Sequence, residues 1–192
     1  MKQFKFLVAA IAIAMAAPMA TAQFTTGGGG GVSTADGDYL PQRGYRGFFD
    51  AGYSVGVGGG SGRVETSTVH GYQFSPYFFA GVGVGFSYFH EGEVWGLPIF
   101  ADFRGEYGNF GTGRVAPFID FRIGYTPTDI SGFYMSPSVG VRYAISPNAG
   151  INLSLGYTMQ NAEVFYYDYY GDTYYKDTAN CGGFTIRLGI DF

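Results

Sequence analysis

The chain closes on the stretch Phe184-Thr185-Ile186-Arg187-Leu188-Gly189-Ile190-Asp191-Phe192, in which every second residue is large and apolar. Thr, Arg, Gly and Asp fill the positions between them. Because successive side chains of a strand point to opposite faces, this alternation predicts a β-strand with one apolar face and one polar face. The same period of two recurs upstream and decides the fold of the rest of the chain.

Seven earlier blocks repeat the pattern and are separated by Gly, Pro, Asn and Ser. The eight blocks cover residues 48–57, 63–74, 78–88, 97–107, 118–125, 134–145, 151–159 and 184–192. The sixth block contains Pro137, whose missing N–H removes a ladder bond, so we expect that strand to begin later or to contain a bulge. The blocks predict an all-β fold, an eight-stranded antiparallel up-and-down transmembrane β-barrel.

Every charged residue inside these blocks falls on the polar register. The set is Asp50, Arg63, Glu65, Asp102, Arg104, Glu106, Asp120, Arg122, Arg142, Arg187 and Asp191. The interior of a barrel with eight strands is just wide enough for side chains to fill it. We therefore expect these six acids and five arginines to form a buried, hydrogen-bonded ionic network that plugs the lumen. A narrow or gated ion path is the alternative.

Alternation alone does not separate a membrane barrel from a soluble, lipocalin-like barrel whose apolar face turns inward. Two features favour the membrane. The polar face carries Gly and Ser with few charges, whereas a water-facing surface is more heavily charged. The apolar face carries Tyr or Phe near the ends of the blocks, as in the aromatic girdles at the two interfaces of a bilayer. These residues are Tyr53, Tyr72, Phe74, Phe78, Tyr88, Tyr107, Tyr125, Tyr143, Tyr157 and Phe192.

The composition narrows the classes of function. The chain has 192 residues, 46% hydrophobic and 14% charged, with a formal net charge of -4. The hydrophobic content argues against disorder, and the excess of Asp and Glu over Lys and Arg argues against a nucleic-acid partner. Cys181 is the single cysteine, so no intramolecular disulfide and no cysteine metal cluster can form.

The N-terminal residues predict export and a spacer. Residues 1–22 begin with Lys2 and Lys5, continue through an apolar run and end in Ala20-Thr21-Ala22, as secretory signal peptides do. Residues 23–44 contain the five-glycine run 27–31 and predict a flexible linker. Residues 45–192 are then the barrel domain, and no later segment offers the 18 or more apolar residues of a transmembrane helix.

The signal peptide, the eight blocks, the turns at Ser75-Pro76 and Ser146-Pro147-Asn148 and the closing strand together resemble the small outer-membrane β-barrels of Gram-negative bacteria. The likeness covers residues 47–192 and is to OmpX-like proteins and to the transmembrane domain of OmpA-like proteins. It implies a location in the outer membrane, both termini in the periplasm, and contact with outer-membrane lipid and lipopolysaccharide. It also implies that Phe192 is the signal recognised by the barrel-assembly machinery.

The segment Asn161 to Cys181 joins the last two blocks and is rich in aromatic residues. Phe165, Tyr166, Tyr167, Tyr169, Tyr170, Tyr174 and Tyr175 surround Gly171-Asp172. This arrangement predicts a hairpin that continues the last two strands above the membrane. Tyr offers a large amphipathic contact area, so we expect surface interaction with an extracellular protein or glycan. Packing against lipopolysaccharide headgroups is the alternative.

One enzyme class is also eight-stranded. Outer-membrane lipid acyltransferases use His, Asp and Ser at the outer rim, and His90 with Ser87 is the candidate pair in this sequence. No Ser-His-Asp pattern accompanies them, so we predict no catalytic residues, no cofactor and no metal site. The predicted role is structural and adhesion-like. The alternatives are a channel for small solutes or hydrophobic ligands and, less favoured, a lipid A-modifying acyltransferase.

Overall fold

The computed structural model describes residues 41–57, 62–90, 93–108, 113–128, 130–146, 148–168 and 173–192, with the backbone alone for 162–168 and 173–180. The predicted signal peptide, residues 1–22, and residues 23–40 of the predicted linker lie outside this part of the chain. No helix in the described residues is long and apolar enough to cross a membrane.

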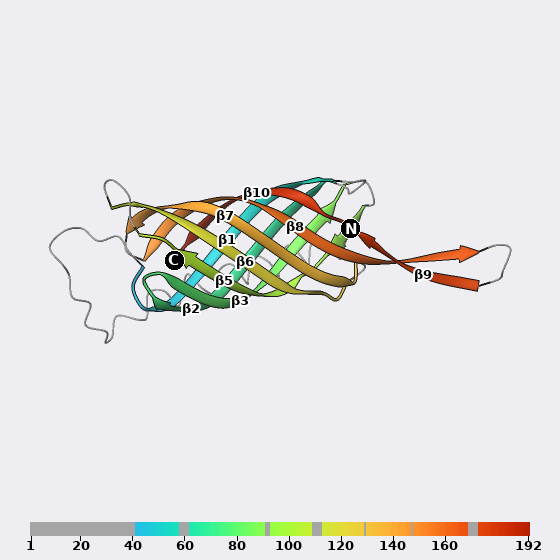
Figure 1. The fold of residues 1–192 in the computed structure, drawn as a ribbon, viewed down its shortest axis with the longest axis horizontal. Helices are drawn as coiled ribbons and strands as arrows, with labels where there is room; N and C mark the ends of the chain where they lie inside the picture. The colour runs from blue at the N-terminus through green and yellow to red at the C-terminus, as the bar shows by residue number, and fades with distance from the viewer. Residues whose placement is uncertain are drawn as a thin grey trace, which may run out of the picture.

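The described residues form ten β-strands joined by turns and short loops (Figure 1). They are β1 (Gly44–Gly56), β2 (Arg63–Ser75), β3 (Phe78–Phe89), β4 (Val94–Gly96), β5 (Ile99–Glu106), β6 (Val115–Thr126), β7 (Gly132–Ser146), β8 (Ala149–Asp168), β9 (Thr173–Asn180) and β10 (Gly183–Asp191). The eight blocks of the sequence correspond to all of these except β4 and β9.

Eight of the strands close into an antiparallel barrel. The sheet runs β1-β2-β3-β5-β6-β7-β8, and β10 pairs with both β8 and β1. Each strand pairs with its neighbours along the chain, and the first and last strands complete the circle. The predicted fold, an eight-stranded antiparallel up-and-down barrel, is confirmed. Closure leaves the sheet without a free edge, which a wall in hydrocarbon requires.

The two remaining strands lie at one end of the barrel. β4 is a short strand that pairs with the end of β3, in a region that the sequence pattern did not identify as a strand. β9 pairs with the far part of β8 and forms with it a two-stranded hairpin that projects beyond the wall (Figure 1). We call this end the hairpin end, and the opposite end, where β10 finishes, the terminal end.

The alternation of the sequence determines which side chains face inward. Along β10, residues from Gly183 to Asp191 alternate strictly between buried and exposed. Thr185, Arg187 and Asp191 point into the lumen, and Ile186 and Leu188 point out. The fold is therefore a cylinder with polar contents and an apolar outer surface.

The expectation for Pro137 was wrong. β7 runs through Pro137 without a bulge there, and Pro137 pairs with Phe121 of β6. The register with β8 is the same before and after Pro137, since Met135 lies opposite Met159 and Ser138 opposite Gly156. Only the two pairs between these are missing. A proline lacks one donor but keeps an extended backbone, so the strand loses pairing on one side and continues.

Candidate functional site

The eleven charged residues predicted to share the lumen all point into the barrel and are at most 6% exposed. The whole set is therefore removed from solvent, where an ionised side chain is stable only if it is paired and hydrogen-bonded. The structure arranges these residues in three clusters along the axis of the barrel.

Arg46 belongs to the same set and was missed by the sequence analysis. It lies on β1 two residues before Phe48, outside the first alternating block, and is 5% exposed. Extending that register by one step would have found it. With Arg46 added to the five predicted arginines, the described part of the lumen holds six guanidinium groups and six carboxylates, so the formal charges balance.

The terminal cluster is built around Asp191. Arg46 donates from Nη2 to Asp191 at 3.0 Å and from Nη1 to Glu106 at 2.6 Å. Arg142 donates from Nε to Asp191 at 3.0 Å, and Asn152 donates from Nδ2 at 2.9 Å. Donors from β1, β7 and β8 therefore converge on one carboxylate of β10, next to the end of the chain.

The central cluster is built around Arg122. Its Nη2 donates to Asp50 at 2.6 Å and its Nε to Asp120 at 3.0 Å. Asp120 also accepts a bond from Arg104 Nε at 3.1 Å. Asp102 is fully buried, yet neither of its carboxylate oxygens has a hydrogen-bond partner, and its ion pair with Arg122 Nε is 3.6 Å long. Asp102 is therefore the most weakly held carboxylate of this cluster.

The hairpin-end cluster lies behind the interrupted pairing at Pro137. Arg187 Nη2 contacts Glu65 at 3.3 Å and donates to Thr158 at 2.7 Å. The hydroxyl groups of Ser136 and Thr158 share a hydrogen bond of 2.9 Å from β7 to β8, at one of the missing ladder pairs. Side-chain hydrogen bonds inside the lumen thus join the two strands where the backbone ladder does not.

Aromatic rings fill the space between the charges. The guanidinium of Arg104 lies 4.0 Å from the ring centre of Phe48 and 4.2 Å from that of Phe118. Phe48 in turn packs edge-on against Phe79, and both belong to a buried cluster that ends in Tyr134. Stacking of this kind holds a flat cation between two ring faces. The lumen is thus packed with side chains across its width at this level.

The hairpin end of the lumen is covered by a small apolar group. Phe89 and Ile130 are buried there, and Val94 and Cys181 pack against them. The loop carrying Ile130 is tied down by Gln160, whose Nε2 donates to the Ile130 carbonyl at 3.0 Å. Hydrophobic side chains therefore line the polar interior at this mouth.

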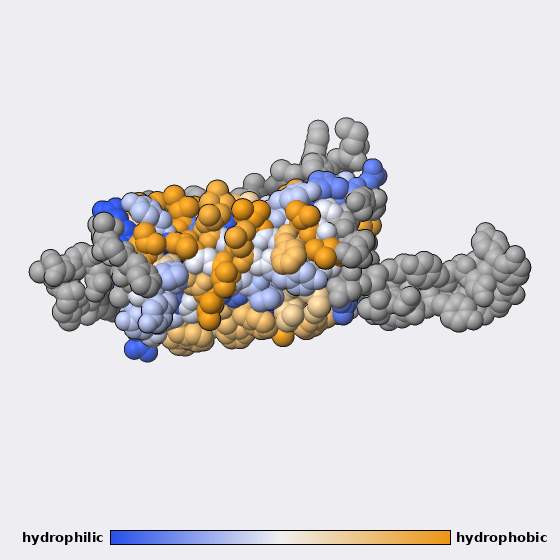
Figure 2. Space-filling model, turned by 45° about the horizontal axis from the view of Figure 1, so that its top comes forward, coloured by the Kyte–Doolittle hydropathy of each residue, from blue (hydrophilic) through white to orange (hydrophobic). Residues whose placement is uncertain are grey.

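The outer surface of the wall is apolar. Ile, Val, Leu and Phe side chains from every long strand are exposed there, and Figure 2 shows hydrophobic residues over the middle of the wall with hydrophilic residues towards its ends. Exposed aromatic residues gather near the two ends, except Phe103 and Phe121, which lie near the middle of the wall. Those of the terminal end are Tyr45, Tyr72, Phe74, Tyr77, Phe78, Tyr107 and Tyr143, and those of the hairpin end are Tyr53, Tyr88, Tyr125, Phe133 and Phe184. Two aromatic belts with an apolar band between them match the surface of a membrane barrel.

The hairpin of β8 and β9 carries the predicted interaction residues. Its backbone pairs Tyr166 with Tyr175 and Tyr167 with Tyr174, and Phe165 lies opposite Lys176. Tyr169 and Tyr170 lie outside the described residues, as do the side chains of the other five. Between residues 162 and 168, β8 pairs only with β9 among the described strands. Both edges of the hairpin are therefore unpaired over this part of its length.

The candidate catalytic pair does not come together. Ser87 is 2% exposed and faces the lumen. His90 is exposed, and its ring lies 5.6 Å from that of Tyr88 and 6.0 Å from that of Tyr53, two residues of the outer surface. The wall separates the hydroxyl from the imidazole. Across the described residues, no group of three or more His, Cys, Asp or Glu is placed to hold a metal ion.

Phe192 completes the seam between the first and last strands. Its N–H donates to the Gly47 carbonyl at 3.0 Å, and its carbonyl accepts from the Gly47 N–H at 2.8 Å. The aromatic ring lies over Gly47, where a Cβ atom would be 2.6 Å from the ring. A glycine on β1 thus makes room for the terminal aromatic residue. Recognition of Phe192 by the assembly machinery stays a prediction.

No protein-family model matches this sequence, and no curated protein is significantly similar to it. Solved structures with the same architecture do match. Neisserial surface protein A (NspA) aligns over 78% of this chain and 95% of its own, at 13% identity and a TM-score of 0.52. The N-terminal β-barrel domain of Pseudomonas aeruginosa OprF aligns over 79% and 98%, at 13% identity and a TM-score of 0.45, and a designed transmembrane β-barrel over 79% and 95%, at 16% and 0.46. The chain has the fold of a small outer-membrane β-barrel.

Proposed function

We propose that this chain is an integral protein of a Gram-negative outer membrane, with a lumen closed to solutes and a hairpin that binds partners at the cell surface. The observation that carries the proposal is the placement of charge. In the described part of the chain, all twelve lumen-facing charged residues are buried and paired inside the wall, and the outer surface is apolar between two aromatic belts. The fold shared with NspA and the predicted signal peptide support the same location.

The filled lumen favours a structural role over a channel. Arg104 lies between two phenylalanine rings, and Phe89 and Ile130 cover one mouth. A barrel of eight strands has no room for both these side chains and a water column. A solute would have to displace ion pairs whose partners would then be buried alone, which costs about 3–5 kcal/mol for each pair broken.

The hairpin favours surface interaction. Its two free backbone edges can accept an extended peptide as an added strand, and its sequence is rich in Tyr. With both termini in the periplasm, the hairpin end lies outside the cell. The partner class that fits is an extracellular protein or a glycan, and contact with lipopolysaccharide headgroups is the competing use of the same residues.

The test separates membrane insertion, conduction and binding. The mature chain, refolded into phospholipid vesicles, should run faster on SDS gels unheated than boiled, and should give no steady current in a planar bilayer. Cells displaying the full protein should bind immobilised extracellular-matrix proteins or glycan arrays, and deletion of residues 162–180 should abolish that binding without altering the gel shift. A soluble mature chain would refute the membrane assignment, a steady current would favour the channel, and binding unaffected by the deletion would refute the role of the hairpin.

A further inference from the structure

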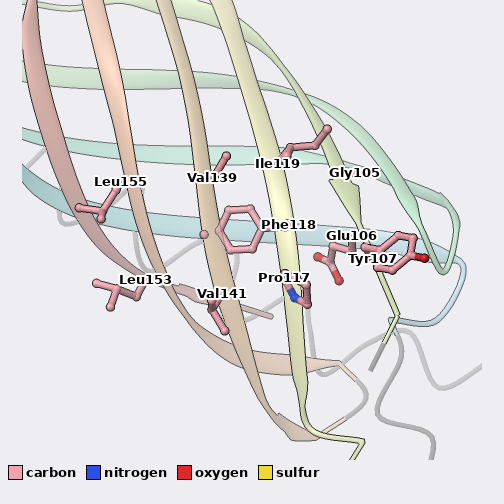
Figure 3. A pocket seen from close by; sticks show the side chains of 11 residues that line it. Gly105, Glu106, Tyr107, Pro117, Phe118, Ile119, Val139, Val141, Leu153 and Leu155 are labelled. Atoms are coloured by element: carbon pink, nitrogen blue, oxygen red, sulfur yellow. The ribbon is translucent and has the colours of Figure 1, made fainter. Parts of the chain in front are cut away.

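The outer wall is hollowed on one side, over β5, β6, β7 and β8 (Figure 3). One hollow of about 730 Å³ is bordered by Pro117 and Ile119 of β6, Val139 and Val141 of β7, and Leu153 and Leu155 of β8. A second, of about 640 Å³, shares Ile119, Val139 and Leu155 and continues towards Phe103 and Phe121. The two form one continuous depression, which we call the wall groove.

The sizes of the outward-facing residues explain why the wall groove forms. Gly105 contributes no side chain on the outer face, and the part of β7 that borders the hollows presents only Pro137, Val139 and Val141 there. Longer side chains stand on both sides, Leu153 and Leu155 on β8 and Phe103 and Phe121 on β5 and β6. The short residues of β7 therefore form the floor and their larger neighbours the rims. Both hollows are open to the surroundings rather than enclosed.

The position of the wall groove in the membrane indicates which molecule would occupy it. It begins beside Tyr107 at the terminal end and reaches Phe121 at the middle of β6. From Pro117 to Phe121 the strand advances four residues, about 14 Å along its own direction, which the tilt of a barrel strand reduces to about 10 Å of depth. This is close to half of an apolar band of roughly 25 Å, the depth of one leaflet. Under the proposed function the terminal end faces the periplasm, so that leaflet is the inner one, which consists of phospholipid.

We propose that the wall groove binds one acyl chain of a phospholipid of the periplasmic leaflet and retains it when the barrel is extracted. The inference rests on the membrane placement proposed above. The groove is continuous with the apolar surface that lipid covers, and Val139, Ile119 and Leu155, between 59% and 65% exposed, offer it only hydrocarbon. Tyr107 lies at the end of the groove where the phosphate of such a lipid would be, and Arg114 comes just before β6 at the same end of the barrel.

A second copy of the barrel fits the wall groove less well. The wall of a barrel is convex, so two walls touch along a narrow line and leave a depression between them empty. A stable protein interface buries about 1,200 Å² or more in total, which such a line does not supply. A single hydrocarbon chain, flexible and of uniform width, can follow the floor along β7 and contact both rims.

The test compares two substitutions of exposed valines. Val139→Trp fills the floor of the groove, and Val82→Trp adds the same side chain on β3, outside the hollows, where Val82 is 66% exposed. Wild type and variants are refolded into phosphatidylethanolamine–phosphatidylglycerol bilayers, extracted into mild detergent and examined by native mass spectrometry. We expect one retained phospholipid on the wild type and V82W, and roughly ten-fold less on V139W, because the buried hydrocarbon contacts are lost.

The same samples distinguish failure of this proposal from failure of the proposed function. The gel mobility of unheated samples reports folding and insertion independently of lipid binding. Should V139W not fold, Val141→Phe replaces it. A barrel that inserts but carries no phospholipid, or carries it equally in V139W, refutes the acyl-chain site alone. If the wild type has the mass of a dimer and V139W has not, the groove binds a second copy of the chain, which also refutes the acyl-chain site. A chain that does not insert at all refutes both proposals.

Discussion

Arg46 on β1 and Asp191 on β10 form a buried ion pair across the seam at which the barrel closes, with Nη2 3.0 Å from Oδ2. The two residues are 145 positions apart in the chain. Their contact joins the first strand to the last within the lumen, on the same seam where Gly47 and Phe192 pair through their backbones. The seam is thus stabilised by a side-chain ion pair in the lumen as well as by the backbone hydrogen bonds between its two strands.

Arg46→Met should therefore destabilise the barrel strongly. The substitution leaves Asp191 and Glu106 with fewer donors in a buried site, and removal of one partner from a buried ion pair costs about 3–5 kcal/mol. Urea unfolding in phospholipid vesicles, followed by the fluorescence of the single Trp95, measures the free energy. Arg43→Met changes an exposed arginine three positions earlier and should cost less than about 0.5 kcal/mol. Equal losses in the two variants would show that the buried contacts of Arg46 contribute nothing.

Asp102 and Asp120, two of the three carboxylates of the central cluster, should differ in their response to neutralisation. Asp120 accepts hydrogen bonds from Arg104 and Arg122, whereas both oxygens of Asp102 lack such bonds. Asp120→Asn should cost about 3–5 kcal/mol, and Asp102→Asn no more than about 1 kcal/mol, because it breaks no hydrogen bond. The same assay measures both free energies of unfolding. A larger loss of stability for D102N than for D120N would contradict the arrangement of the central cluster.

Gly124 should not tolerate even a methyl group. A Cβ atom there would lie 2.6 Å from the Cα of Phe100, a backbone atom of the neighbouring strand that cannot turn away. Gly124→Ala should therefore cost about 1–3 kcal/mol through a forced separation of β5 and β6. Gly105→Ala is the matched control, since its Cβ would contact only the Ile119 side chain at 3.4 Å. A neutral G124A would show that β5 and β6 have room to separate.

Cys181 reports on the closure of the hairpin end. It lies between β9 and β10, and burial against Phe89 and Ile130 raises the pKa of its thiol, opposed by the smaller effect of Arg63. Alkylation needs the thiolate, so at pH 8 iodoacetamide should react with Cys181 more slowly than with a free thiol. The pH at which the rate increases should lie above the range in which an ordinary thiol titrates. Phe89→Ala should accelerate the reaction at pH 8. A rate equal to that of a model thiol would mean that the mouth is open.

Removal of the hairpin should leave the barrel intact. Residues 162–168 of β8 and the whole of β9 pair with each other and with no other described strand. Replacement of residues 162–180 by a short Gly-Ser turn should change the unfolding free energy by less than about 1 kcal/mol. A large loss of stability would show that the hairpin packs on the mouth of the barrel.

The fold could be predicted because alternation is a local property. A strand with Ile186, Leu188 and Ile190 on one side and Arg187 and Asp191 on the other has only one way to separate them, so the sequence indicates which residues face inward. The limits of the strands were harder to predict. β4 has only three residues, too few for a period to be visible, and Pro137 was misinterpreted because a proline stops pairing on one side of a strand only.

The pairing inside the lumen could not be predicted from the sequence. That Asp191 contacts Arg46, Arg142 and Asn152 depends on how the strands are staggered around the closed barrel. The wall groove has the same origin. Gly105, Val139 and Leu155 come from three different strands, and only their register brings them to one place. A linear pattern contains neither relationship.

The balanced ions inside the cylinder also constrain its biogenesis. The first hairpin alone carries Arg46, Asp50, Arg63 and Glu65, whose partners include residues of β5, β6 and β10. Arg63 and Glu65 pair with each other on β2, but were β1 and β2 to enter hydrocarbon before the others, Arg46 and Asp50 would lack the partners that they have in the closed barrel, at several kcal/mol each. Pairing of these strands with β5, β6 and β10 before insertion would avoid this cost, so we expect the barrel to be largely closed before its wall meets the hydrocarbon of the bilayer.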